Sequence, residues 1–250
     1  MKIKNFIIFI IIGLILIYFL KKNNVLENFV NEKKYVYWTG GYDSTFRLCY
    51  LLVVKKKIVQ PIYLRYNLDN DDVNKYWVRK NRIQELEAME KVRELLFKKY
   101  PYTRNLLKKT IVVSNDLPDE EYTKEFNNLN LFPTKRKVHQ YEHLFRYAYK
   151  NKVPIDLGVI GLHTKKQFII YLHKHLKKID DSFYLPNEEI LSYCRFPLFG
   201  LPKPKMFEIA KDHDFDDILS LSWSCWFPKS DGTPCGKCPM CRERYIPHPK

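Results

Sequence analysis

The stretch Thr39-Gly40-Gly41-Tyr42-Asp43-Ser44-Thr45 separates a strand-like run at residues 35–38 from a helix-like run at residues 46–54. Two adjacent glycines let the backbone turn its N–H groups inward without a side-chain clash, and the following helix adds the positive end of its dipole. A strand, a glycine turn and a helix N-terminus together form a cradle for an anion. The alternative from these residues alone is an ordinary strand–helix turn with a Ser/Asp helix cap.

Hydroxyl and carboxylate side chains follow the two glycines. Ser44 and Thr45 add hydroxyl donors, and Asp43 can hold the turn or a magnesium ion. The loop lacks the Gly-Lys-Ser/Thr ending of a Walker A motif. It resembles the Ser-Gly-Gly-x-Asp-Ser pyrophosphate loop of the N-type ATP pyrophosphatases, with Thr39 in place of the first serine. Enzymes of that superfamily split ATP between the α and β phosphates to adenylate a carbonyl oxygen. The resemblance implies that ATP and Mg²⁺ contact Thr39, Gly40, Gly41, Asp43, Ser44 and Thr45.

The composition limits the size of the fold and the class of partner. With 250 residues, 46% of them hydrophobic, the chain can hold one α/β domain with a sizeable core and small additions. The net charge of +15 indicates an anionic partner, which can be a nucleotide, a nucleic acid or a membrane surface. The positive residues are spread along the chain, and runs such as residues 55–57 and 135–137 are typical of solvated faces. Nucleic acid is therefore an alternative partner that the sequence does not favour.

Strand-like and helix-like runs alternate through most of the chain. Strands are expected at residues 35–38, 58–66, 110–114, 155–161 and 194–198. Helical periodicity predicts helices at residues 46–54, 78–99 and 134–150 and from residue 204, with a partly helical loop at residues 119–132. This alternation predicts an α/β fold with a doubly wound, mainly parallel sheet covered by helices on both faces.

The ends of these strands predict where a ligand binds. In doubly wound sheets, ligands bind beyond the carboxyl ends of the strands. The loops after Trp38, Tyr66, Ser114 and Gly161 should therefore surround one site. Tyr66 and His163 are candidates for substrate contact at this edge, although a histidine at the start of a helix is more often structural.

Four of the six cysteines lie close together near the end of the sequence, with the spacing C-x9-C-x2-C-x2-C. Two-residue spacings bring thiolates within reach of one tetrahedral zinc ion, and four thiolates leave no open position, as in a structural site. An iron–sulfur cluster is the alternative. This crowding is unlike a disulfide framework and favours a reducing compartment. The expected metal ligands are Cys225, Cys235, Cys238 and Cys241.

An almost unbroken apolar run occupies residues 6–20, with lysines on both sides. It is a little shorter than the roughly 20 residues that a transmembrane helix prefers. We expect an uncleaved membrane anchor at residues 1–22 and a polar linker at residues 23–34. More lysines follow the run than precede it, so the positive-inside rule predicts a membrane-anchored protein with its catalytic domain on the cytosolic side. The alternative is a hydrophobic tail packed on the domain or on a partner.

The loop and the cysteine pattern together resemble the 7-cyano-7-deazaguanine synthases of the queuosine pathway. The similarity also takes in residues 85–88, the Pro-Leu…Lys segment at residues 197–203 and residues 207–209, and it extends over about residues 33–244. It implies an adenine nucleotide alpha hydrolase-like fold, with a PP-loop ATP pyrophosphatase domain at residues 35–220 and a four-cysteine zinc segment at residues 221–246. It also implies a homodimer as one assembly.

The activity that the resemblance implies is that of an ATP-dependent carbon–nitrogen ligase. The carboxylate of 7-carboxy-7-deazaguanine attacks ATP to give an acyl-adenylate and pyrophosphate, ammonia displaces AMP, and a second ATP converts the amide to the nitrile. The resemblance gives catalytic roles to Asp43, Ser44 and Lys203, with Lys203 near the phosphates at a helix start. The cofactors and substrates implied are ATP, Mg²⁺, Zn²⁺, a deazapurine and ammonia.

Three positions depart from the family pattern. Residues 65–68 read Arg-Tyr-Asn-Leu where Asp-Tyr-Gly-Gln is usual, residues 161–164 read Gly-Leu-His-Thr where Gly-x-Asn is usual, and Pro202 replaces the serine before Lys203. All three lie at the predicted edge of the site. Two alternatives therefore stay open: a PP-loop enzyme with another acceptor, such as tRNA, and a membrane-tethered protein that binds nucleotide and zinc without turnover.

Overall fold

The computed structural model describes residues 33–65, 80–114, 119–131, 140–162 and 167–244. The elements within these residues belong to the compact unit Lys34–Lys250. Tyr66 and His163, the two predicted substrate residues, lie outside the described residues, as does the apolar run at residues 6–20.

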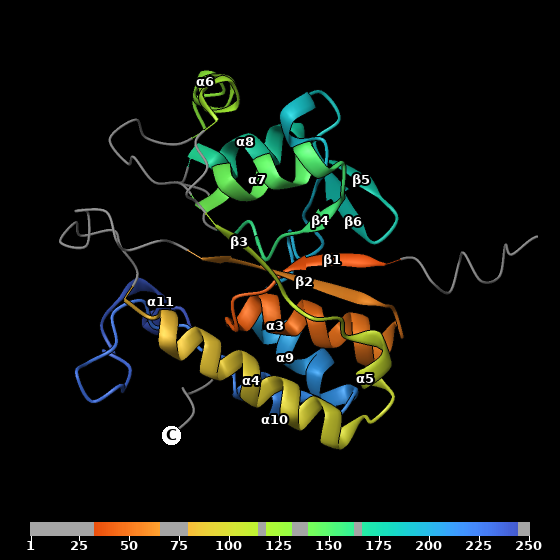
Figure 1. Ribbon diagram of the computed structural model, residues 1–250, viewed down its shortest axis with the longest axis vertical. Helices are drawn as coiled ribbons and strands as arrows, with labels where there is room; N and C mark the ends of the chain where they lie inside the picture. The colour runs from red at the N-terminus through yellow and green to blue at the C-terminus, as the bar shows by residue number, and fades with distance from the viewer. Residues whose placement is uncertain (1–32, 66–79, 115–118, 132–139, 163–166, 245–250) are drawn as a thin grey trace, which may run out of the picture. The chain divides into compact units, whose positions relative to one another are not determined.

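A five-stranded parallel sheet forms the centre of this unit, with the strand order β3-β2-β1-β4-β7 (Figure 1). Its strands are β1 (Lys34–Tyr37), β2 (Val59–Arg65), β3 (Ile111–Ser114), β4 (Ile155–Asp156) and β7 (Cys194–Arg195). The order runs outward from β1 to β3 on one side, and then continues with β4 and β7 on the other side. The sheet therefore changes direction at β1, where doubly wound folds bind ligands. The predicted α/β fold with a mainly parallel sheet is confirmed.

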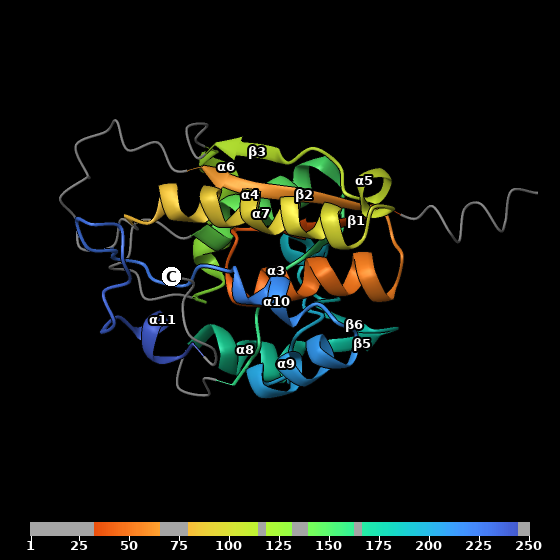
Figure 2. The same ribbon diagram turned by 90° about the horizontal axis from the view of Figure 1, so that it is seen from below.

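Helices cover both faces of this sheet (Figures 1 and 2). The first face carries α3 (Tyr42–Cys49), the π-helical turn η1 (Tyr50–Val54), α4 (Arg82–Lys99), α9 (Lys203–Asp212) and α10 (Asp216–Ser220). The second face carries α6 (Glu120–Asn128), α7 (Gln140–Asn151) and α8 (Gln167–His175). The shorter elements are α5 (Thr103–Leu106), the 3-10 turn η3 (Glu189–Leu191), α11 (Pro239–Arg242) and the antiparallel pair β5 (Lys177–Ile179) and β6 (Ser182–Tyr184).

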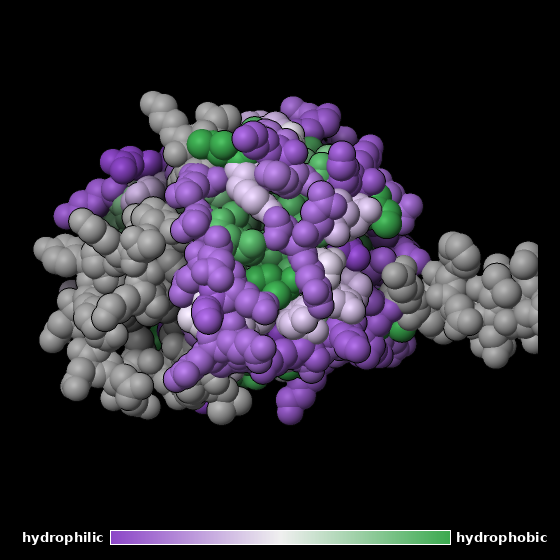
Figure 3. Space-filling view, turned by 90° about the horizontal axis from the view of Figure 1, so that it is seen from above, coloured by the Kyte–Doolittle hydropathy of each residue, from purple (hydrophilic) through white to green (hydrophobic). Residues whose placement is uncertain are grey.

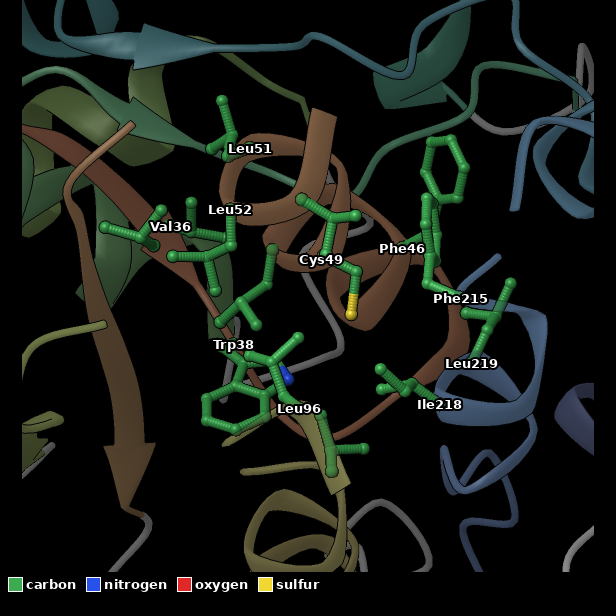
Figure 4. Packing of buried hydrophobic residues seen from close by; sticks show 14 of the residues in the cluster. Val36, Trp38, Phe46, Cys49, Leu51, Leu52, Leu96, Phe215, Ile218 and Leu219 are labelled. Atoms are coloured by element: carbon green, nitrogen blue, oxygen red, sulfur yellow. The ribbon is translucent and has the colours of Figure 1, made fainter. Parts of the chain in front are cut away.

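The strand alternation explains why two apolar cores form. Val36 and Trp38 point to the first face, whereas Tyr37 between them packs in the cluster of the second face, as the period-two geometry of a strand requires. On the first face Trp38 is fully buried in the cluster that also holds Phe46 and Phe215 (Figure 4). Each such side chain stabilises the fold by about 1.5–3 kcal/mol. Figure 3 views the molecule from the side of the second face, where hydrophilic side chains cover most of the outer surface formed by the described residues.

Several parts of the fold differ from the sequence prediction. The strand expected at residues 194–198 pairs only at Cys194–Arg195. The strand expected at residues 155–161 pairs only at Ile155–Asp156, because the chain then turns, with the Val159 N–H donating to the Leu157 carbonyl at 2.9 Å. The hairpin of β5 and β6 was not predicted. Its strands have three residues each, and Asp180 in the connecting turn has φ +49°.

The predicted membrane localisation is corrected. Among the residues that the structure describes, no helix is long and apolar enough to span a bilayer. The longest of them, α4, has 18 residues, but nine are charged, and its apolar side is used to cover the sheet. The predicted membrane-anchored localisation is corrected on this finding, and residues 1–22, for which the membrane helix was predicted, lie outside the described residues.

Candidate functional site

The glycine loop follows β1 directly and leads into α3. Gly40 has φ +68°, a conformation that residues with a side chain rarely adopt. A Cβ at Gly40 would lie 2.7 Å from the Glu85 carbonyl oxygen and 3.1 Å from Met89 Cγ in α4. Glycine is therefore required here both for the backbone conformation and for the close approach of α4.

The second glycine lies among polar atoms. A Cβ at Gly41 would lie 3.0 Å from Thr39 Oγ1, 3.5 Å from the Trp223 carbonyl oxygen and 3.9 Å from Ser44 Oγ. Gly41, the N-cap residue of α3, is extended, with φ −73° and ψ 161°, and as a glycine it brings no side chain to cap the helix. A helix N-terminus with this arrangement suits an anion. The residues present therefore fit the phosphate groups of a nucleotide.

Hydroxyl groups tie the loop together. Ser44 Oγ accepts from the Thr39 N–H at 3.3 Å and donates to the Gly41 carbonyl at 3.2 Å. Thr39 Oγ1 lies 3.4 Å from Ser44 Oγ and accepts from the Gly41 N–H at 3.3 Å. These bonds are long for neutral hydrogen bonds, so Thr39 and Ser44 can turn their hydroxyls toward a stronger acceptor.

The side chain of Thr45 does not lie where the sequence predicted, which was beside the loop. Its side chain is fully buried, and Thr45 Oγ1 accepts from Trp38 Nε1 at 3.1 Å. Its N–H donates to the Gly41 carbonyl at 2.9 Å as part of α3. Thr45 therefore belongs to the helix and the core, because the turn of α3 carries its side chain toward the sheet.

Asp43 lies in the first turn of α3, where the segment after β4 approaches it closely. A Cβ at Gly158 would lie 3.3 Å from Asp43 Cβ and 3.4 Å from the Ser44 N atom. The Asp43 carboxylate also interacts electrostatically with Arg244. A carboxylate beside a phosphate cradle is the oxygen donor that Mg²⁺ uses together with phosphate oxygens, so Asp43 fits the predicted metal contact.

Lys203 is buried beside the loop at the start of α9. Lys203 Nζ donates to the Glu243 carbonyl at 3.1 Å and lies 6.0 Å from the centre of the Tyr42 ring. Tyr42 Oη in turn donates to the Lys203 carbonyl at 3.3 Å. Lys203 thus lies next to α3, and its ammonium group also holds the end of the cysteine segment.

The four predicted metal ligands come together. Their sulfur atoms all lie within 4.8 Å of one another, and Cys235 Sγ lies 4.0 Å from Cys241 Sγ. A tetrahedral ion with metal–sulfur bonds of about 2.3 Å needs sulfur–sulfur separations of about 3.8 Å. The residues at Cys225, Cys235, Cys238 and Cys241 therefore fit a single metal ion.

The surrounding backbone prepares one of these thiols for a metal. Burial raises the pKa of Cys235, but N–H donors from Lys237 and Cys238 outweigh it and bring the pKa down to about 6. The Cys238 N–H donates to Cys235 Sγ at 3.4 Å, and the Cys235 N–H donates to Cys225 Sγ at 3.3 Å. Burial raises the pKa of the Cys225 and Cys241 thiols.

The cysteine segment contacts the glycine loop directly, which the sequence did not reveal. The Trp223 N–H donates to the Gly40 carbonyl at 2.8 Å. Arg244 Nη1 donates to Ser222 Oγ at 3.2 Å and to Ser224 Oγ at 3.0 Å. Burial lowers the pKa of the Arg244 guanidinium to about 10. The signal available in the sequence was the arginine three residues after Cys241.

Two buried networks that contain charged side chains also support the site without having been predicted. Arg47 Nε donates to Asp156 Oδ2 at 2.8 Å, and this pair joins α3 to β4. The Glu85 carboxylate accepts from Tyr63 Oη at 3.0 Å and from Asn81 Nδ2 at 3.1 Å. The second network fixes the turn of α4 whose carbonyl meets Gly40.

Comparison with known proteins agrees with the resemblance drawn from the loop and the cysteines. The model of the family described as "Queuosine biosynthesis protein QueC" matches residues 33–247, which is most of the chain. A search of curated proteins gave no match.

Among solved structures, the chain is similar to the U34-tRNA thiolase NcsA from Methanococcus maripaludis with its 4Fe–4S cluster, at 14% identity and a TM-score of 0.38. The comparison covers 74% of this chain and 58% of that one, so the chain spans less than two thirds of the length of the thiolase.

Proposed function

We propose that this chain, which belongs to the QueC family, is an ATP-dependent ligase that converts 7-carboxy-7-deazaguanine and ammonia to 7-cyano-7-deazaguanine. The observation that carries the proposal is the glycine turn at the N-terminus of α3, where Thr39 Oγ1 and Ser44 Oγ lie beside Gly41 and the N-cap residue brings no side chain. This turn suits the pyrophosphate portion of ATP, which must be held while the α-phosphorus is attacked.

In the first step, a carboxylate oxygen of the substrate attacks the α-phosphorus, the bond between the α-phosphorus and its bridging oxygen breaks, and pyrophosphate leaves. The N–H groups at the start of α3 stabilise the charge that develops on the leaving group. The hydroxyls of Thr39 and Ser44 are positioned to donate to the same oxygens. Lys203 adds a positive charge beside α3.

In the second step, ammonia attacks the acyl carbon of the adenylate and AMP leaves with the former carboxylate oxygen. The amide oxygen then attacks a second ATP in the same way, and loss of AMP and of the two amide protons gives the nitrile. Asp43 is the residue that would hold Mg²⁺, which would neutralise phosphate charge. Both adenylations use the same loop, so one set of residues serves both halves of the reaction.

The cysteine segment would hold a structural zinc ion through Cys225, Cys235, Cys238 and Cys241. The separations of at most 4.8 Å between their sulfur atoms support one ion over a cluster, because a cluster places several iron atoms between its ligands. With all four positions taken by thiolates, the ion would stabilise the fold and activate no water.

The proposal is tested by measuring AMP and pyrophosphate release by the metal-loaded protein with ATP, Mg²⁺ and ammonia, with and without 7-carboxy-7-deazaguanine. We expect release that depends on the deazapurine, a product with the mass of the nitrile, and loss of both in Asp43→Ala. Asp212→Ala, which changes an exposed carboxylate at the end of α9, is the charge-matched control and should retain activity. ATP binding without release would contradict the proposal.

The net charge of +15 supports a second candidate, in which the same adenylation acts on tRNA. Binding through Lys and Arg to phosphates weakens steeply as salt increases. The test is binding of unmodified tRNA between low and physiological salt, followed by AMP release with tRNA as the only acceptor. No binding at low salt would exclude this candidate.

A further inference from the structure

The contact between Trp223 and Gly40 controls the orientation of one peptide group in the phosphate loop. The Trp223 N–H donates to the Gly40 carbonyl at 2.8 Å. In a planar trans peptide, the carbonyl and the N–H of the next residue point in opposite directions. The bond that fixes the Gly40 carbonyl therefore also fixes the direction of the Gly41 N–H. That N–H donates to Thr39 Oγ1 at 3.3 Å, on the side of the loop where Ser44 Oγ also lies.

Trp223 is in turn held by the cysteine segment. Trp223 Nε1 donates to the Cys225 carbonyl at 2.8 Å, so the indole is attached to the backbone of the first metal ligand. Trp223 is 8% exposed and packs with Cys225, Cys238 and Ala88 of α4. The position of its N–H therefore depends on how well the cysteine segment is ordered.

Arg244 holds the same backbone from the other end of the segment. It follows Cys241 by three residues, and its guanidinium donates to Ser222 Oγ and Ser224 Oγ, on either side of Trp223. Arg244 Nη2 also donates to the Ser220 carbonyl at 3.3 Å. Three bonds from one planar group therefore fix residues 220–224, and only arginine has a fork of donors with this geometry.

We propose that Arg244 is a positioning residue for the phosphate loop: with a metal held by the four cysteines, its guanidinium fixes Trp223, whose N–H orients the Gly40–Gly41 peptide for an anion. Metal loading and anion affinity are then coupled through Trp223 and Arg244. The proposal rests on the proposed function only for the identity of the anion, because the contacts themselves involve no ligand.

The coupling follows from how the segment is tied together. Nine residues separate Cys225 from Cys235, and closing such a loop costs conformational entropy that a metal ion offsets. Without the ion, the ends of the segment are joined only by the hydrogen bonds and the apolar packing described above. Local opening of the segment then releases the Trp223 N–H and allows the Gly40–Gly41 peptide to rotate, with the freedom that glycine has.

The test uses the full chain and compares Arg244→Gln with Arg242→Gln. Both remove one positive charge, but Arg242 is exposed in α11. The readouts are metal content, amide hydrogen exchange in a peptide covering residues 39–45, and affinity for inorganic pyrophosphate by calorimetry. With one metal ion per chain retained, Arg244→Gln should increase exchange and weaken pyrophosphate binding, each by about tenfold, equal to about 1.4 kcal/mol. Arg242→Gln should stay within about twofold of the wild type on the same scale.

Two further samples keep the test decisive if Arg244→Gln does not fold. Arg244→Lys keeps the charge but loses the fork, and Ser224→Ala removes one acceptor; both should move in the same direction by a smaller factor. Metal-depleted wild type should show faster exchange at residues 39–45. Wild-type exchange at these residues in metal-loaded Arg244→Lys and Ser224→Ala, or in the metal-depleted protein, would overturn the proposal.

Failure of the proposed coupling and failure of the proposed ligase function give different results in these experiments. Exchange at residues 39–45 that depends on Arg244 and on the metal supports the coupling even where no nitrile forms. Nitrile formation with exchange that is independent of both supports the proposed function and overturns the coupling.

Discussion

On the first face of the sheet, α3, α4, α9 and α10 pack around Trp38, Phe46 and Phe215. On the second face, α6, α7 and α8 pack around an aromatic series in which Phe145 contacts Phe126 and Phe168. Both clusters consist of buried apolar side chains, but α4 of the first face also contacts Gly40 and the cysteine segment. We infer that substitutions on the first face change stability and ligand binding together, whereas those on the second face change stability alone.

The largest expected effect comes from Gly40→Ala. The residue would be strained at φ +68°, which costs about 1–3 kcal/mol, and its Cβ would lie 2.7 Å from the Glu85 carbonyl. Moving the loop by the distance needed to relieve this clash should reduce turnover and pyrophosphate affinity by about a hundredfold. Gly200→Ala is the matched control, because Gly200 has φ +84° but its Cβ would meet no atom within 4 Å. Equal losses of affinity in both variants would show that strain alone, and not contact with α4, controls the loop.

Replacing a metal ligand is expected to have the next largest effect. Cys238 is 5% exposed and belongs to the cluster that holds Trp223. Cys238→Ser should reduce metal retained after dialysis from about one equivalent to near zero and lower the melting temperature, because metal binding contributes directly to folding. Cys194→Ser changes a buried cysteine in the cluster of the second face, so it should lose stability but keep the metal. Metal loss in Cys194→Ser as well would remove the distinction between the faces.

A substitution that creates a cavity in the core of the second face should separate stability from binding most sharply. Phe145 is fully buried between Phe126, Tyr141 and Phe168. Phe145→Ala should lower the free energy of unfolding by about 3–5 kcal/mol. Below its melting transition, the folded variant should bind pyrophosphate with wild-type affinity, measured by calorimetry at low temperature. A parallel loss of affinity in the folded protein would break the comparison between the faces.

The parts of the site that could be predicted from the sequence are those written in consecutive residues. The glycine loop and the four cysteines each carry their own spacing, so local chemistry was sufficient to predict the strand–turn–helix order around the loop and the approach of the four cysteines to one another. Thr45 was predicted to line the loop because it follows Ser44 directly in the sequence. In the structure, the turn of α3 buries the Thr45 hydroxyl against Trp38.

Contacts between distant residues could not be predicted in this way. The Trp223 N–H donates to the carbonyl of Gly40, which lies near the other end of the domain's sequence. Arg47 of α3 donates to Asp156 of β4, which also follows it much later in the sequence. No local pattern encodes either pair, since each depends on the strand order. The strand expected at residues 155–161 was too long for a related reason: the chain must turn to bring Gly158 against Asp43.

The smallest expected effect concerns Asp119, which caps α6 on the second face. Asp119 Oδ1 accepts from the Tyr122 N–H at 3.0 Å, and the side chain pairs with Lys150. The hydrogen bond from Lys150 and that from the Tyr122 N–H hold the pKa of this carboxyl below its usual value. Its folded-state pKa is therefore lower than its unfolded-state pKa, so its stabilisation is complete above the unfolded value and is lost as the pH falls through the folded value.

Asp119→Ala should therefore cost about 1 kcal/mol of the free energy of unfolding at pH 7, measured by urea denaturation. The difference from the wild type should shrink as the pH is lowered below about 4, the usual pKa of an aspartate in an unfolded chain, and it should disappear as the pH falls through the lower folded-state pKa. Asp212→Ala, at the C-terminal end of α9 where a negative charge opposes the helix dipole, should show no loss at pH 7. Pyrophosphate affinity should be unchanged in both variants. A difference between Asp119→Ala and the wild type that stays constant down to pH 2 would mean that side-chain packing, and not the charge of Asp119, stabilises α6.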